Sequence, residues 1–215
     1  MRACLIPLLF AGCLGLTVRA AEGVRIIVRT TLDGKPVADA VVSATPLDHP
    51  VPTPGPGNTA EIEQKNQEFS PYVTVIQVGG KVIFPNHDTV QHHIYSLSKP
   101  KRFEIPLYQA GASESVVFDR PGIVAIGCNI HDWMVAYIAV VPTPFFAKTD
   151  DTGAATLPSL SPGRYRLEIW HPRAAAPVVQ EISSAPENAT VLEVKVALKP
   201  DKRIRRAPSG KGTDY

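Results

Sequence analysis

The stretch Gly127-Cys128-Asn129-Ile130-His131-Asp132-Trp133-Met134 brings a thiol, an imidazole and a thioether onto one short segment. It lies between two strand-like apolar runs, Ile123–Ile126 and Val135–Val141, so we expect a loop that joins two strands. The three-residue step from Cys128 to His131 allows both side chains of a tight loop to turn toward one point. Because sulfur ligands combined with imidazole select copper, this loop predicts a copper site built on strands.

A second group of metal-ligating side chains precedes this loop. Residues 85–94 contain His87, His92 and His93 at the start of a strand-like run. Two histidines, one cysteine and a weak axial methionine form the trigonal site of blue-copper proteins. Neighbouring side chains on a strand point to opposite faces, so only one of His92 and His93 should reach a metal from a regular strand. His87 is expected to be a surface loop residue.

The composition predicts an all-β protein around this site. The chain has 215 residues, with 21 prolines and 15 glycines among short runs rich in valine, isoleucine and threonine. That mixture is typical of short strands joined by tight turns, and the length suits one or two small domains. Sustained helical periodicity is absent outside the N-terminus.

Residues 1–20 have the pattern of a secretory signal. Arg2 supplies the positive start, an apolar run follows from Leu5 to Leu16, and Val18-Arg19-Ala20 resembles a cleavage site. A lipoprotein anchor at Cys13 is the less favoured alternative. We therefore expect a periplasmic protein whose mature chain keeps Cys128 as its single cysteine. A lone thiol in an oxidising compartment is a liability unless it is buried or occupied.

The two metal-ligating segments together resemble the cupredoxins. The spacing Cys128-x-x-His131-x-x-Met134 is similar to the short ligand loop of amicyanin, and Asn86 followed by His92 also fits the family pattern. The resemblance implies a Greek-key β-sandwich that carries electrons with one copper per chain. It implies the ligands His92, Cys128, His131 and Met134. His93 then stands where the family usually has asparagine, which favours His92 as the upstream ligand.

The flanking sequence resembles a different module. Gly34–Val42, Thr149–Gly153 and Leu157–Tyr165 are similar to parts of the transthyretin-type, carboxypeptidase regulatory-like β-sandwich. The resemblance implies a cupredoxin domain inserted into this small sandwich, as in bacterial exported proteins of the methylamine utilization protein type. The expected division of the chain is a signal peptide (1–20), a discontinuous flanking sandwich (23–48 with 144–198), a proline-rich linker (49–60), a cupredoxin domain (61–142) and a basic disordered tail (199–215).

The tail is the most strongly charged segment. Residues 199–215 hold six cations and two anions, with few apolar side chains. Such a segment is expected to be a solvated tail, and the alternative is an electrostatic tether to an acidic partner or an anionic lipid. Membrane contact is expected only through this tail, and no nucleic-acid partner is expected.

Four further side chains have other expected roles. Asp132 is most simply a turn residue, with orientation of a ligand histidine as the alternative. Trp133 is expected in the core, or else as a shield or apolar docking surface beside the metal. His171 is expected to be structural, and His49 is expected to be inert in the linker.

Electron transfer by a mononuclear copper site, with an unidentified redox partner protein, is the function that these patterns favour. Copper storage without redox traffic is the second candidate, although storage sites tend to be rich in Met or His and the mature chain has only Met134. A metal-free interaction module would leave the thiol beside His and Met unexplained. We do not expect an enzyme, because paired His-x-His motifs and Gly-x-Ser-x-Gly are absent from the sequence.

Overall fold

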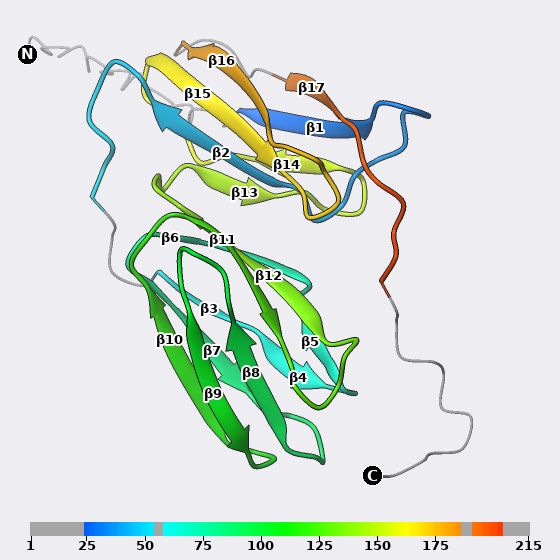
Figure 1. The fold of residues 1–215 in the computed structure, drawn as a ribbon. Coiled ribbons are helices and arrows are strands. Elements are labelled where there is room, and N and C mark those ends of the chain that lie inside the picture. Colours follow the sequence, from blue (N-terminus) through cyan, green and yellow to red (C-terminus); the bar gives the residue numbers. More distant parts are fainter. Residues whose placement is uncertain (1–23, 54–57, 186–190, 204–215) are drawn as a thin grey trace, which may run out of the picture.

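A computed structural model describes residues 24–53, 58–185 and 191–203. The described residues form strands, turns and loops without any helix, so the prediction of an all-β fold is confirmed (Figure 1). No helix in this part of the chain is long and apolar enough to cross a membrane. The signal predicted at 1–20 and most of the predicted tail lie outside the described residues.

Seventeen strands make up the described structure, and they fall into two groups. The strands are β1 (Arg25–Thr30), β2 (Val41–Pro46), β3 (Thr59–Glu61), β4 (Glu63–Lys65), β5 (Glu68–Ser70), β6 (Val73–Gln77), β7 (Gly80–Pro85), β8 (His92–Ser96), β9 (Phe103–Tyr108), β10 (Ser113–Phe118), β11 (Gly122–Gly127), β12 (Val135–Val141), β13 (Phe146–Lys148), β14 (Ala154–Thr156), β15 (Gly163–Trp170), β16 (Val178–Ser184) and β17 (Val191–Val196).

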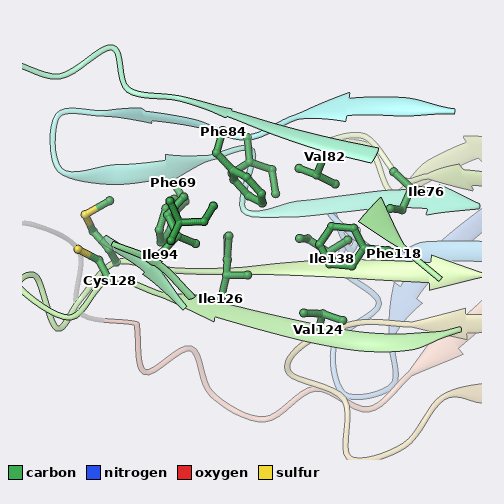
Figure 2. Close-up of a cluster of buried hydrophobic side chains, with 14 of the residues drawn as sticks. Phe69, Ile76, Val82, Phe84, Ile94, Phe118, Val124, Ile126, Cys128 and Ile138 are labelled. Atoms are coloured by element: carbon green, nitrogen blue, oxygen red, sulfur yellow. The ribbon is translucent and has the colours of Figure 1, made fainter. Parts of the chain in front are cut away.

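Strands β3 to β12 form the first sandwich, which we call the inner sandwich. One sheet has the order β6-β12-β11-β8-β9, the facing sheet has the order β10-β7-β3, and β4 and β5 form a separate hairpin. Apolar residues alternate along these strands, which gives each sheet one buried face. Figure 2 shows this core, in which Phe84 and Phe118 lie between the sheets with Ile126 and Ile138, and Cys128 lies at one end.

The remaining strands form a second sandwich, which we call the outer sandwich. Its sheets have the orders β14-β1-β17 and β13-β2-β15-β16. Strand β1 pairs in parallel with β17, and β2 pairs antiparallel with β15, so the two N-terminal strands are central in their sheets. A separate apolar core, with Tyr165 and Leu157 among its fully buried side chains, fills this sandwich. The chain thus starts one sandwich, builds another, and returns to complete the first (Figure 1).

A small apolar cluster joins the sandwiches. Val41 of the outer sandwich packs with Val73, Ala139 and Val141 of the inner one. Beside this cluster the Lys148 ammonium donates to the carbonyl of Val73 at 3.0 Å. The two sandwiches therefore meet through both apolar and polar contacts.

Two segments differ from their sequence-based expectation. Thr59 and Ala60, expected in the linker, belong to β3, because that strand pairs in parallel with β7 at the sheet edge. Lys199–Arg203, expected in the disordered tail, is held against the fold: the Lys199 amide donates to the Arg173 carbonyl at 2.9 Å, and the Arg203 guanidinium lies 4.0 Å above the Tyr72 ring.

The sheet orders lead to a prediction about folding units. A fragment of residues 58–142 is expected to fold alone, because it contains every strand of the inner sandwich. A fragment of residues 144–198 is expected to stay unfolded, because removal of β1 and β2 takes the central strand from each sheet and exposes its neighbours' edges. Proton–nitrogen NMR spectra of the two fragments test this. A well-dispersed spectrum from residues 144–198 would contradict the discontinuous outer domain.

Candidate metal centre

One strand and one loop supply the predicted ligands. His92 begins β8, and the Cys128–Met134 loop joins β11 to β12, whose last pair is Gly127 with Val135. Within the loop the Met134 amide donates to the carbonyl of His131 at 2.9 Å, and the Cys128 amide donates to the carbonyl of Met134 at 3.3 Å. These hydrogen bonds make the loop a compact turn, and the turn positions the ligand side chains.

His92, Cys128 and His131 come together at this end of the inner sandwich. One ligand atom from each lies within 4.8 Å of the ligand atoms of the other two. The Cys128 Sγ and the His131 Nδ1 are 3.7 Å apart, and the rings of His92 and His131 have centroids 5.0 Å apart. Two imidazoles and a thiol at such separations are the donor set of a copper or zinc site.

His92 presents one nitrogen to this cluster and uses the other for support. Its side chain is 0% exposed, and its Nε2 lies 3.0 Å from the Asp88 Oδ2. Its Nδ1 is buried without a hydrogen-bond partner in the described structure. An orphaned buried imidazole nitrogen is costly, and a metal ligand role would remove that cost. The residues present therefore fit a bound metal.

Asp88 is the residue beside the cluster that sequence reasoning missed. Burial acts to raise the pKa of its carboxyl, but the Gln67 amide, His92 and the Thr89 amide outweigh it and hold the pKa below its usual value. The carboxylate thus receives a 2.6 Å hydrogen bond from the Gln67 amide while it contacts His92. Asp132, which was weighed for this role, is exposed on the ligand loop. A turn-forming acid four residues before a ligand histidine was the available signal.

Cys128 is buried, and its surroundings favour the thiolate. Burial alone raises the pKa of the thiol, but His92 and the backbone amides of His93 and Ile130 lower it further than burial raises it. The thiolate is the form of cysteine that binds metals. Conversely, burial lowers the pKa of His92, while the Cys128 sulfur and the Asp88 carboxylate raise it, and the net shift is upward.

The two adjacent histidines have different surroundings. His93 is outside the three-residue cluster; its Nε2 lies 2.9 Å from the Glu104 carboxylate, and its ring lies near Tyr95. The pairing of β8 with β9 is irregular between His92 and Ile94, and the two histidine side chains have different partners there. His93 contributes to the site through its backbone amide, which helps to lower the pKa of the Cys128 thiol.

Met134 and Trp133 complete the surroundings of the cluster. Met134 is 1% exposed and belongs to the same apolar core as Cys128. Trp133 packs against that core, and its Nε1 donates to the Gln67 carbonyl at 3.0 Å. Its ring centroid lies 5.4 Å from that of His131, so it covers one side of this histidine.

The remaining histidines lie outside the cluster. His87 is a half-exposed loop residue whose Nδ1 lies 2.9 Å from the Glu63 carboxylate. His171 is buried in the outer sandwich, where burial lowers its pKa to about 4. His49 contacts the hydroxyl of Tyr165 at 3.1 Å, so it is packed rather than idle in the linker.

The Ile130 amide yields a test of how the loop tunes the site. Ile130→Pro removes an N–H that acts on the Cys128 sulfur. A hydrogen bond to the thiolate favours the reduced metal, so its loss should lower the reduction potential of the copper-loaded protein by some tens of millivolts, taking about 1 kcal/mol per bond and 59 mV per 1.4 kcal/mol. Redox titration at one pH measures the shift. Ile130→Val keeps the amide and is the matched control; an unchanged potential in the proline variant would show that this amide does not tune the sulfur.

Comparison with known proteins found structural matches only. No family model matches the sequence, and the search of curated proteins found no match. A purple cupredoxin from Nitrosopumilus maritimus is 28% identical over 38% of this chain and 98% of its own, with a TM-score of 0.35. A Cu-containing nitrite reductase from Thermus scotoductus is 24% identical over 45% of this chain and 25% of its own, with a TM-score of 0.37. A reduced amicyanin variant is 14% identical over 47% of this chain and 98% of its own, with a TM-score of 0.37. The first of these neighbours is named a cupredoxin and the second a copper-containing enzyme.

Proposed function

We propose that this protein is an exported electron carrier in which His92, Cys128, His131 and Met134 would hold one copper ion. The observation that carries the proposal is the buried cluster of one thiol and two imidazoles, in which the His92 Nδ1 has no other partner. Copper bound by such a set would supply reversible one-electron chemistry.

The surroundings of the cluster support a carrier rather than a store. Ligand residues 92, 128 and 134 are almost fully buried, and they are fixed by strand pairing and by the folded loop. A rigid, dry site limits rearrangement when the metal changes charge, whereas a store has to release its cargo. We propose a carrier and not an enzyme, because His92 and Cys128 are buried.

Copper addition tests the proposal directly. Metal-free protein titrated with Cu(II) is expected to bind one equivalent and to develop an intense visible charge-transfer band from the thiolate. Cys128→Ser should abolish the band, because serine provides no sulfur. His87→Ala is the matched control, since His87 lies outside the cluster and should leave the colour unchanged. A colourless protein that binds one equivalent would favour copper storage instead.

Export is the second part of the proposal. The signal-like residues 1–20 support cleavage and release into the periplasm, with the Cys13 lipoprotein anchor as the alternative. Mass spectrometry of the mature protein separates the two: cleavage after Ala20 gives a soluble chain, and a lipid-modified Cys13 gives a membrane-bound one.

A further inference from the structure

A cavity of about 710 Å³ lies beside the ligand loop. Its walls come from the loop (Asp132–Val135), from the β5–β6 connection with Tyr72, and from the C-terminal segment Lys199–Arg203 with Arg173. We call this cavity the inter-sandwich groove, because its walls belong to the inner sandwich, to the β15–β16 connection of the outer sandwich and to the C-terminal segment. In Figure 1 the C-terminal segment runs past the inner sandwich on the side where β12 and β5 lie.

The cationic wall of the groove is fixed in place. Lys199 and Arg173 exchange two hydrogen bonds, since the Lys199 amide donates to the Arg173 carbonyl at 2.9 Å and the Arg173 Nε donates to the Lys199 carbonyl at 2.7 Å. Arg203 lies on the Tyr72 ring and pairs with Asp201 at 2.6 Å. These contacts therefore hold the C-terminal segment against the fold.

Three cationic side chains of this wall form no ion pair among the described residues. Among the described residues, no carboxylate lies within ion-pair distance of Arg173, Lys199 or Lys202, whereas Arg203 is paired. Apart from the Arg203–Asp201 pair, the lining holds three cations against the two carboxylates of Glu68 and Asp132. A surplus of one sign on a concave surface raises the local concentration of oppositely charged partners. The groove therefore favours an occupant that carries carboxylates.

The groove also reaches the candidate metal centre. Trp133 lines the groove, and its ring centroid lies 5.4 Å from that of His131. Its Nε1 hydrogen bond to the Gln67 carbonyl holds it in that position. Met134, a proposed copper ligand, also lines the groove, so an occupant would lie against one proposed ligand and one side chain away from another.

We propose that the inter-sandwich groove docks an acidic protein partner, whose carboxylates pair with Arg173, Lys199 and Lys202 beside Trp133. The inference rests on the proposed function, because it supplies the partner class for that electron carrier. A protein fits better than a membrane or a nucleic acid, since the groove is concave and its walls include the carboxylates of Glu68 and Asp132. These acids repel a dense polyanion, whereas a protein surface can place its own cations opposite them.

The first experiment uses the metal-free full chain, labelled with ¹⁵N, and as the probe a synthetic decapeptide of five Glu, two Lys and three Ser residues, which offers cations to Glu68 and Asp132 as well as carboxylates to the cationic wall. Addition of the peptide is expected to shift the Trp133 indole signal and the amides of residues 199–203, and salt should weaken the effect. The double variant Lys199→Glu/Lys202→Glu should weaken the apparent Kd about tenfold, as reversal of two surface charges implies.

Lys81→Glu/Lys195→Glu is the matched control. It makes the same change of net charge on two exposed lysines in strands outside the groove. This variant should keep the apparent Kd within about twofold of the wild type. Equal weakening in both double variants, or peptide shifts away from Trp133 and residues 199–203, would overturn the docking site.

A second arm addresses the membrane as occupant. Vesicles of phosphatidylcholine and phosphatidylglycerol in a 7:3 ratio are sedimented with the protein, and we expect no binding that depends on Lys199 and Lys202. Binding lost in their double variant would overturn the proposal in favour of a lipid surface. Because both arms use metal-free protein, a failure of copper to bind would remove the proposed function without affecting the docking result.

Discussion

His92→Ala is expected to abolish tight copper binding. His92 supplies the cluster with a buried Nδ1 that has no hydrogen-bond partner. Without it, the cluster keeps only the Cys128 thiol and the His131 imidazole. Loss of a side chain that supports a metal ligand weakens metal binding about 10–100-fold. Loss of the ligand itself should therefore raise the Kd for copper by a larger factor. Competition with a chelator of known affinity measures the Kd, and the visible band should be lost.

His93→Asn is the matched control for this ligand assignment. The His93 side chain contacts Glu104 rather than the cluster, and its contribution to the Cys128 sulfur comes from a backbone amide that asparagine retains. The variant should therefore keep the visible band and bind copper nearly as well as the wild type. A coloured His92→Ala protein together with a colourless His93→Asn protein would move the ligand to His93.

Asp88→Ala is expected to weaken copper binding about 10–100-fold while the visible band remains. The Asp88 carboxylate lies 3.0 Å from the His92 Nε2, which fixes the ring orientation and directs Nδ1 into the cluster. The carboxylate also accepts the Gln67 amide, so thermal unfolding must be measured alongside the Kd. Asp88→Asn keeps an acceptor oxygen and should restore part of the affinity.

Asp132→Ala separates this effect from a general loss of negative charge near the metal. Asp132 is exposed on the ligand loop itself, so its removal should leave both the Kd and the band nearly unchanged. If Asp132→Ala weakens binding and Asp88→Ala does not, the support for His92 has been assigned to the wrong carboxylate.

The strands around the ligand loop could be predicted from the sequence because their signals are local. Residues 123–126 and 135–141 read as strands, and the structure has β11 and β12 at these places, with the loop between them. The position of Cys128, His131 and Met134 on one loop follows from that hairpin. The all-β class followed in the same way from short β-branched runs between turns.

The features that were missed depend on contacts between distant segments. Strand β9 has no clear strand pattern, since it contains Pro106, but an edge position in its sheet tolerates a proline. Asp88 accepts a hydrogen bond from the Gln67 amide and contacts the His92 ring. Neither contact can be predicted from the amino-acid composition. Lys199–Arg203 reads as a charged tail, and only the position of Tyr72 and Arg173 shows what holds it.

The parallel pairing of β1 with β17 sets the order in which the chain can complete its structure. Every strand of the inner sandwich is synthesised before β13. The pairing of β1 with β17 can form only after β17, the last strand of the described chain, has been synthesised. Loop-closure entropy makes such a distant pairing a late event. The cluster of His92, Cys128 and His131 can therefore be assembled while β1 is still without β17, and a nascent or C-terminally clipped chain would present the unpaired edge of β1 beside that assembled cluster.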